Sequence, residues 1–494
     1  MKLTRRSTLG LMTVGGAAIA LGGYSWSRQN FFGPTRPLII PPLIEGMMQD
    51  GTRNFDLKLG RHATQFIDGV NTPTFGINGT YLGPTLRLRA GSRVRINVQN
   101  DIGEPSTLHW HGMHVPAKAD GGPHQVIENG ASWHPEFEVK QSASTFWYHS
   151  HMMPRTGFQV YHGLAGMIIV EDEKANALEL PQDYGVNDIP LILQDRRFGA
   201  DGTFEYLSSM HDRMMGMTGN TLLVNGTANP HFVARTNSIR LRILNGSNSR
   251  IYTLAFNDNR RFHQVASDGG LLEGPFETDA ITLAPAERAE IIVNLSDGKP
   301  ATLLSTTPSL GGMMGRGMMS MMMGGDESFK VLEIRPDERR TQLPVLPKKL
   351  VELEAPDPTN AVPTRTFSLD MGMGMGMMMG GGAMTINGRS MDMNRIDETV
   401  RIGTREIWQI ENPSMMPHPF HIHDVQFRIL DRNGMPPGPG ERGNKDTVLV
   451  NQNERVRLLL GFSDYADAQT PYMFHCHNLE HEDAGMMGQF VVVS

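Results

Sequence analysis

The sequence predicts an all-β protein built from two or three β-sandwich domains. At 494 residues the chain is too long for a single hydrophobic core. Short runs in which apolar and polar residues alternate recur along it, as at 85–89 and 238–243, and each is typical of a half-buried strand. The 54 glycines and 31 prolines suit tight turns between short strands, and no long stretch has helical periodicity.

The first 34 residues have the features of an export leader. Arg5 and Arg6 precede a mildly apolar stretch from Leu9 to Leu21, and Ala18-Ile19-Ala20 offers a small-residue cleavage site. Paired arginines here are typical of a twin-arginine (Tat) signal, which predicts a bacterial periplasmic protein. A Sec signal or an uncleaved anchor is the alternative. The apolar stretch is too short for a standard membrane span, so we expect no span in the mature protein.

The rest of the chain divides into three domains. Strand-like runs fill 35–171 and 172–335, and a proline-rich, charged segment at 336–363 indicates a linker before a third domain at 364–494. Histidine motifs occur in the first and third domains, and the second domain is predicted to be a spacer. A site that uses both sets of motifs requires the first and third domains to touch.

Four His-x-His pairs stand next to strand-like runs. Alternate residues of a strand point to the same face, so each pair places two imidazoles side by side. One such pair is weak evidence, because solvated pairs are common, but eight rings are enough for a cluster of three copper ions. The pairs are His109 and His111, His149 and His151, His421 and His423, and His475 and His477.

Cys476, the single cysteine of the chain, lies inside the last of these pairs. In an extended segment its sulfur faces away from the two flanking rings. Two imidazoles, a thiolate and a weak axial thioether are typical ligands of a blue-copper site, and His418, His481 and Met486 remain to complete one. The alternative is a buried cysteine in a polar turn.

With these motifs, the sequence from about Arg36 onward resembles the multicopper oxidases, and most closely the bacterial periplasmic copper-efflux oxidases, which are laccase-like cuprous oxidases. The resemblance implies three cupredoxin-like Greek-key domains and four copper ions. It also implies one-electron oxidation of substrate at a type 1 copper and reduction of dioxygen to water at a trinuclear cluster. By the same resemblance, the type 1 ligands are His418, Cys476, His481 and axial Met486, the type 2 ligands are His109 and His421, and the type 3 ligands are His111, His149 and His477 on one ion and His151, His423 and His475 on the other.

Two carboxylates lie beside these motifs. Asp120 follows the first histidine pair, and Glu482 follows His481. Reduction of dioxygen consumes protons, and a positioned carboxylate can relay them, which is the role the resemblance implies for both residues. The alternatives are that Asp120 caps a Gly-Gly turn and that Glu482 orients imidazoles by hydrogen bonding.

The 34 methionines are the other unusual feature, with clusters at 210–217, 313–323 and 371–384. The last two clusters are too rich in glycine for a stable helix, so we expect loops there. Thioether sulfur selects Cu(I), and the resemblance implies that such insertions deliver Cu(I) to the type 1 copper. A flexible linker and a sink for oxidants are the alternatives. The candidate substrate ligands are Met371, Met373, Met375, Met415 and Met416.

One position departs from the resembling enzymes, which tend to have an aspartate four residues before the type 1 histidine. This chain has Ser414 there, with Asp370 and Asp424 as possible replacements for the missing carboxylate.

We therefore predict a monomeric oxidase that uses dioxygen and takes electrons from Cu(I), with small aromatic reductants as secondary substrates. The net charge of -7, without a basic block, gives no support to nucleic-acid binding. The enzyme alternatives are a general laccase and an Fe(II) or Mn(II) oxidase. The non-enzyme alternative is a copper-sequestering protein. A relative that has lost its coppers, such as the division-associated members of the superfamily, would show gaps in the ligand set, and this sequence has none.

Overall fold

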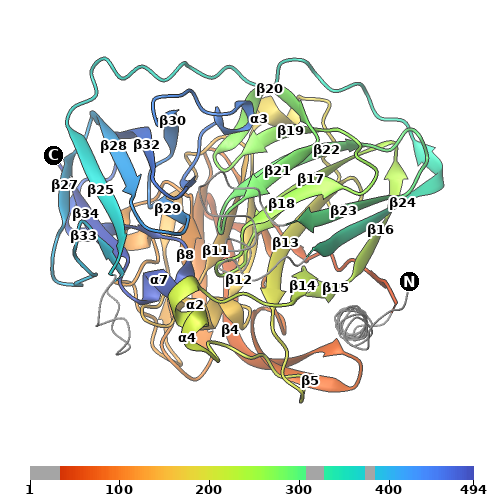
Figure 1. Ribbon diagram of the computed structural model, residues 1–494, viewed down its shortest axis with the longest axis horizontal. Coiled ribbons are helices and arrows are strands. Elements are labelled where there is room, and N and C mark those ends of the chain that lie inside the picture. The colour runs from red at the N-terminus through yellow and green to blue at the C-terminus, as the bar shows by residue number, and fades with distance from the viewer. Residues whose placement is uncertain (1–33, 307–327, 373–383) are drawn as a thin grey trace, which may run out of the picture.

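A computed structural model of the chain describes residues 34–306, 328–372 and 384–494, which form six β-sheets packed in pairs as three sandwiches. The predicted all-β, cupredoxin-type fold is confirmed. In Figure 1 the third sandwich (blue) and the second (green) lie on opposite sides of the molecule, and the first (orange) lies between them. The leader at 1–33 and most of two methionine clusters fall outside the described residues.

The first sandwich shows how alternation in the sequence builds a core. In β7 the side chains of Val94, Ile96 and Val98 are fully buried, whereas Arg93 and Arg95 are exposed on the other face. One sheet contains β3 (Met47–Gln49), β4 (Thr52–Ile67), β5 (Val70–Ile77), β7 (Arg93–Asp101), β9 (Ser132–Trp133) and β10 (Glu136–Glu138); the other contains β2 (Leu43–Ile44), β6 (Thr85–Arg89), β8 (His109–His111), β11 (Ser144–His149) and β12 (Ala165–Glu171).

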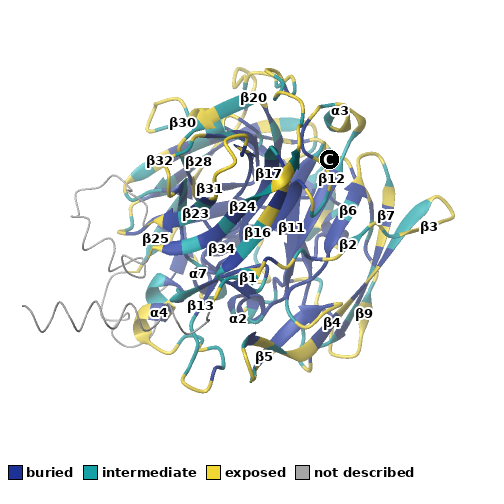
Figure 2. Ribbon diagram, turned by 90° about the vertical axis from the view of Figure 1, so that its right-hand side faces the viewer, coloured by how far each residue is buried: buried dark blue, intermediate teal, exposed yellow. Residues whose placement is uncertain are grey.

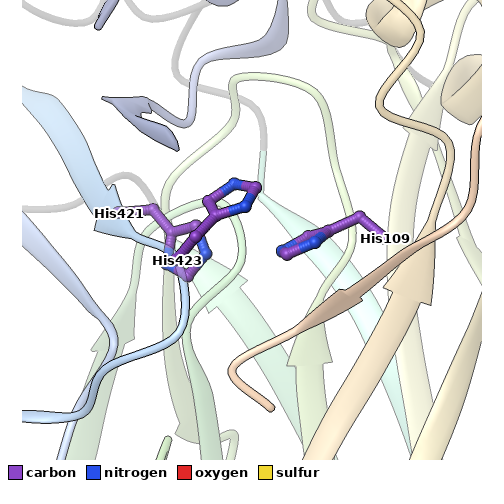
Figure 3. Close-up of side chains that lie close together, drawn as sticks. All are labelled: His109, His421 and His423. Atoms are coloured by element: carbon purple, nitrogen blue, oxygen red, sulfur yellow. The ribbon is translucent and has the colours of Figure 1, made fainter. Parts of the chain in front are cut away.

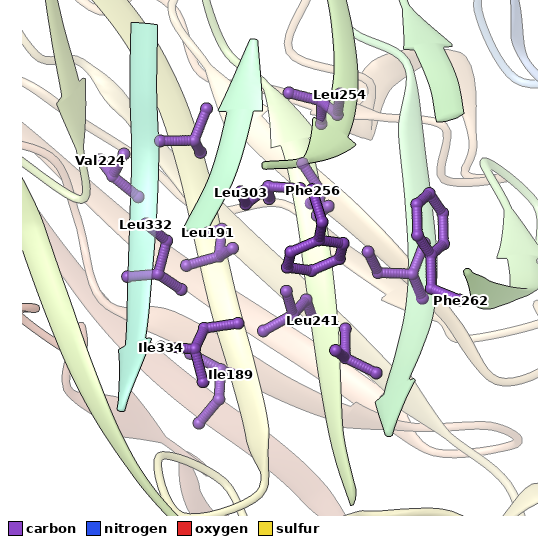
Figure 4. Close-up of a cluster of buried hydrophobic side chains, with 14 of the residues drawn as sticks. Ile189, Leu191, Val224, Leu241, Leu254, Phe256, Phe262, Leu303, Leu332 and Ile334 are labelled. Carbon is purple, nitrogen blue, oxygen red and sulfur yellow. The ribbon is translucent and has the colours of Figure 1, made fainter. Parts of the chain in front are cut away.

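The second sandwich has the largest hydrophobic cluster, which Figure 4 shows between its two sheets. One sheet has the order β1 (Arg36–Pro37), β16 (Pro230–Thr236), β24 (Phe329–Thr341), β23 (Ala301–Thr306), β18 (Tyr252–Phe256) and β21 (Ala280–Leu283). The other has the order β15 (Thr227–Ala228), β14 (Thr221–Val224), β13 (Asp188–Arg196), β17 (Ser238–Asn245), β22 (Arg288–Asn294), β19 (Phe262–Ser267) and β20 (Gly270–Thr278). Thus β1, at the start of the predicted first domain, pairs with the second sandwich, and β24 continues into the predicted linker.

The third sandwich carries the C-terminal motifs on one of its sheets. That sheet has the order β27 (Glu398–Arg401), β34 (Met487–Val493), β33 (Asp467–Cys476), β29 (His418–Ile422) and β31 (Thr447–Val450). The other sheet has the order β26 (Met384–Ile386), β25 (Thr364–Met371), β28 (Thr404–Asn412), β32 (Glu454–Phe462) and β30 (Phe427–Arg432).

The few helices of the described residues are short, and three of them meet where the sandwiches join. Helix α7 (Leu479–Asp483) of the third sandwich contacts α2 (Thr156–Tyr161) of the first and α4 (Met210–Met215) of the second. The others are α3 (Glu173–Asn176) and the 3-10 turns η1 (Ala117–Ala119) and η2 (Pro439–Glu441). Figure 2 shows the buried residues concentrated in the sheets and the exposed ones in turns. None of the helices in the described part of the chain is long and apolar enough to cross a membrane.

Candidate copper centre

The predicted histidine pairs come together between the first and third sandwiches. Strand β8 carries the first pair and is antiparallel to β11, which ends at His149. Strand β29 pairs with β33, so that His421 lies opposite His475. Strands β11, β29 and β33 each end inside a His-x-His pair. The second ring of each pair therefore follows the strand and does not lie in the sheet. Figure 3 shows His109 of β8 pointing toward His421 and His423 from the other sandwich.

The rings sort into groups whose candidate ligand atoms lie within 4.8 Å of one another. Two of the groups contain the same histidines as the two predicted type 3 sets. The predicted type 2 pair, His109 and His421, forms a third group together with His423. These three groups are His111, His149 and His477; His151, His423 and His475; and His109, His421 and His423, and a further group of His111, His421 and Asp446 meets the same distance.

Hydrogen bonds fix which nitrogen of His109 and of His421 faces the cluster. The Nδ1 atoms of His109 and His421 lie 2.9 and 2.7 Å from the backbone oxygens of Asp120 and Asp446. Their Nε2 atoms are buried and have no hydrogen-bond partner among the described residues. Both nitrogens of His477 are also buried without such a partner. Unpaired imidazole nitrogen inside a protein is costly, so these atoms fit metal ions that would coordinate them.

His111 is oriented the other way round. Its Nε2 lies 3.1 Å from Asp446 Oδ1 and 3.2 Å from Thr447 Oγ1, which leaves Nδ1 toward the cluster, 3.5 Å from Nε2 of His149. A hydrogen bond at one ring nitrogen selects the tautomer that presents the other as a metal ligand.

Burial prepares the rings for metal binding. Desolvation lowers the pKa of seven cluster and type 1 histidines well below the usual value, so these rings are neutral at neutral pH; they are His111, His149, His151, His418, His421, His423 and His477. Burial likewise lowers the pKa of His481 to about 4. Neutral imidazole is the form that binds copper.

The predicted type 1 residues form a separate buried group. The sulfur of Cys476 lies 3.4 Å from Nδ1 of His418 and 3.8 Å from Nδ1 of His481. The outer nitrogens are held by the protein: Nε2 of His418 lies 2.8 Å from Ser414 Oγ, and Nε2 of His481 lies 3.0 Å from the backbone oxygen of Met214. Met486 is fully buried, and its backbone oxygen accepts a hydrogen bond from Cys476 N–H.

Burial raises the pKa of the Cys476 thiol, so the sulfur is protonated at neutral pH and must release its proton when it binds copper. Because Cys476 lies between His475 and His477, a few covalent bonds join the sulfur to both predicted type 3 groups. This matches the connection that alternation along a strand predicts.

Asp120 and Glu482 both contact cluster rings directly. Oxygen Oδ2 of Asp120 lies 2.8 Å from Nδ1 of His423. Glu482 lies between two rings, with oxygens 3.3 Å from Nδ1 of His151 and 3.2 Å from Nδ1 of His475. Burial opposes ionisation of Glu482, but these two rings leave its pKa below the usual value. The contacts orient imidazoles and leave both carboxylates beside the cluster, which suits the proposed transfer of protons.

A pair that the sequence analysis did not single out, Arg288 and Asp446, also belongs to the site. Asp446 holds His111, and Arg288 of the second sandwich binds both oxygens of Asp446 at 2.7 and 2.6 Å. Both side chains are fully buried. The sequence does place two charged residues, Lys445 and Asp446, directly before the apolar run of β31. Charged side chains next to a buried strand require partners, so this pattern could have pointed to the pair.

The candidate substrate methionines are only partly described. Met415 is 40% exposed and Met416 is buried, next to Ser414. Met371 ends β25 and packs against the core of the third sandwich. Met373 and Met375 lie outside the described residues.

The two candidate carboxylates differ in availability. Asp424 is buried, with an oxygen 2.7 Å from Nδ1 of His114, and is therefore not free to replace the aspartate expected at position 414. Asp370 is partly buried in β25.

These features define a copper-dependent oxidoreductase with a cupredoxin-type fold, and the comparisons with known proteins agree. Multicopper oxidase family profiles match residues 58–175 and 358–494. A multicopper oxidase of Staphylococcus aureus is 37% identical over 464 residues, which is 93% of this chain and 92% of the relative. The chain belongs to the multicopper oxidase family.

Two further relatives show the breadth of this similarity. A solved laccase-like multicopper oxidase, CueO of Ochrobactrum sp., superposes with a TM-score of 0.83 at 38% identity and covers 92% of this chain and 100% of its own. The cell division protein FtsP of Salmonella typhimurium is 36% identical over 501 residues, covering 100% of this chain and 99% of the relative.

Proposed function

We propose that this enzyme couples oxidation of Cu(I) to the reduction of dioxygen to water and serves copper tolerance outside the cytoplasm. The reaction balances as four Cu(I), one dioxygen and four protons giving four Cu(II) and two waters. Bound copper supplies one-electron oxidation at Cys476 and four-electron reduction at the histidine cluster. We assign four ions to the ligand sets implied by the resemblance, including axial Met486 and the type 2 pair His109 and His421.

The protein groups around these sites support the assignment. Neutral, buried rings and the buried thiol exclude water from the ligands. Cys476 provides a short covalent connection between the two sites. Asp120 and Glu482 touch the rings of His423, His151 and His475, and we propose that they hand on the protons consumed by dioxygen.

One observation favours a metal ion over an organic reductant. Both type 1 rings, His418 and His481, are completely buried, and their outer nitrogens contact Ser414 and Met214 rather than solvent. An aromatic molecule therefore has no exposed ring edge to bind. Met415 and Met416 directly follow Ser414, which contacts His418, and their thioethers suit soft Cu(I).

Oxidation of small aromatic compounds is the second candidate function. It is supported by similarity to the Ochrobactrum enzyme, which has oxidase activity towards lignin model compounds.

Oxygen uptake by the purified enzyme tests the proposal. We expect intense blue colour, about four copper ions per chain, and Cu(I)-dependent uptake with a kcat/KM above that for a phenolic or aromatic amine reductant. Replacing 373–383 by a glycine-serine segment of equal length preserves β25 and β26 and should lower kcat/KM for Cu(I). Unchanged Cu(I) turnover would remove these methionines from the proposal. Colourless protein loaded with copper would contradict the role of Cys476.

We also infer export through the twin-arginine leader, and a monomeric state. Lysine substitution at both Arg5 and Arg6 should retain the protein in the cytoplasmic fraction. Size-exclusion chromatography with light scattering would check the mass.

A further inference from the structure

Helix α4 of the second sandwich is a fixed structure that lies on the third sandwich. Ser209 caps it: the Ser209 hydroxyl accepts from Asp212 N–H, and the Asp212 carboxylate accepts from Ser209 N–H. Arg197 binds both oxygens of Asp212 at 3.0 Å. The helix contacts α7, which contains His481. The Arg197–Asp212 ion pair and the contact with α7 therefore both fix the position of α4.

The C-terminal end of α4 covers the buried type 1 group. The backbone oxygen of Met214 lies 3.0 Å from His481 Nε2, and Asn478 donates to the backbone oxygen of Met215 at 3.1 Å. Just beyond the helix, Met217 N–H donates to buried Glu480 at 2.8 Å. The side of His481 that faces away from Cys476 is therefore in contact with one peptide group of α4.

The outer surface of the same helix carries soft metal ligands. Met210 is 52% exposed, His211 is exposed, and Met214 and Met215 are partly exposed. Residues four apart in a helix are neighbours, so Met210 lies beside Met214 and His211 beside Met215. Exposed methionine on a solvent face is not explained by core packing. The one carboxylate of the helix, Asp212, is occupied by Arg197.

We propose that the surface formed by Met210, His211, Met214 and Met215 binds Cu(I) as substrate and delivers its electron to the type 1 copper. This inference rests on the proposed cuprous oxidase function. Thioether and imidazole donors suit Cu(I). Each bound Cu(I) loses one electron and leaves as Cu(II); the electron crosses the hydrogen bond between Met214 and His481, and four such electrons with four protons convert one dioxygen to two waters. The second sandwich, predicted to be a spacer, thereby supplies an entry point.

Leucine substitution separates the side chains from the backbone contact. The variant M210L/M214L/M215L keeps the helix, because leucine forms helices as well as methionine, and it retains the Met214 peptide that contacts His481. The variant M47L/M48L is the matched control, since these methionines are 74% and 58% exposed on β3 of the first sandwich. Blue absorption and copper content report that either variant is folded and loaded.

Two measurements on the copper-loaded enzyme test the proposal. In oxygen uptake, the α4 variant should raise KM for Cu(I) about tenfold, because it loses contacts made in the ground state, whereas the control should match the wild type. In titration with Ag(I), a soft ion that cannot be oxidised by the enzyme, the α4 variant should lose one binding equivalent relative to the wild type.

The possible results distinguish a failure of the proposed function from a failure of the α4 site. No Cu(I)-dependent uptake by the wild type would overturn the proposed function. Cu(I)-dependent uptake by the wild type with the same KM and the same Ag(I) stoichiometry in the α4 variant would overturn the α4 site alone. A rise in KM that also appears in M47L/M48L would likewise overturn it, because the effect would not be specific to α4.

Discussion

Replacing Arg288 by methionine should cause a large loss of stability, because this side chain joins all three sandwiches beside the copper centre. Its guanidinium binds Asp446 of the third sandwich and donates to the backbone oxygens of Thr145 and Asp268. Asp446 in turn holds His111 of the first sandwich. Removing one partner of a buried ion pair costs about 3–5 kcal/mol.

Protonation of Asp446 sets the lower end of this range. Burial raises the pKa of Asp446 and Arg288 opposes that rise, so without the guanidinium the carboxyl takes up a proton rather than remaining an unpaired buried charge. The backbone oxygens of Thr145 and Asp268 still lose a donor, at about 1 kcal/mol or more each. We therefore expect a loss of at least about 3 kcal/mol in the metal-free protein.

Unfolding of metal-free R288M in guanidinium chloride, followed by tryptophan fluorescence, measures this loss in the free energy of unfolding. Arg335→Met is the matched control, since Arg335 pairs with Glu333 at the surface of the same sandwich and its side chain is 39% exposed; we expect less than about 1 kcal/mol there. The double variant R288M/D446N should recover part of the loss if the carboxyl is its source. A loss in R288M no larger than that in R335M would refute the reasoning. In copper-loaded protein, R288M should also hold less copper at the group of His111, His149 and His477, because His111 loses its support.

The remaining predictions concern the site itself. Cys476→Ser should abolish the blue absorption while copper at the histidine cluster remains, as followed by electron paramagnetic resonance. Glu482→Gln should keep its colour and copper content but lower oxygen turnover about 100-fold or more if the carboxylate relays protons, and a rate near that of the wild type would leave it an orienting role only. Gly121→Ala should destabilise the protein by about 2 kcal/mol or more in thermal unfolding, since φ is +80° and a Cβ would lie 1.9 Å from Leu108 O. The stability of the metal-free protein should fall as pH drops below about 6.5. Below that pH the histidines of the unfolded chain bind protons, whereas buried His481 in the folded protein, with a pKa of about 4, stays neutral. Constant stability between pH 7 and 5 would contradict this.

Much of the site could be predicted because its ligands follow the two-residue period of a strand. That period placed both rings of a pair on one face and the Cys476 sulfur on the other. It could not supply Asp446 or Met214, which reach the rings from separate chain segments. Asp446 directly precedes β31, which lies beside β29 only after the sheet has formed. Met214 contacts His481 through its backbone oxygen, a group that every residue has, so the identity of its side chain gave no signal.

The fold was predictable to the level of alternating strands and their division into sandwiches, but not at the points where the chain crosses between them. Arg36 and Pro37 pair with β16 of the second sandwich, and Leu38 joins its core, although they precede the first sandwich in sequence. No local pattern specifies a partner that lies nearly two hundred residues away. Packing of the completed second sandwich determines where this segment binds.

Similarity over the whole chain does not by itself determine the chemistry. This chain is 37% identical to a multicopper oxidase and 36% identical to a cell division protein, a difference too small to separate the two roles. The donor atoms carry more weight. Nε2 of His109 and of His421 are buried without a partner in the described structure, whereas the opposite nitrogen of each ring is hydrogen bonded. A protein that had no use for metal would gain stability by replacing such rings with apolar side chains. Their presence, together with the buried thiol of Cys476, therefore argues for an oxidase more strongly than the identity figures do.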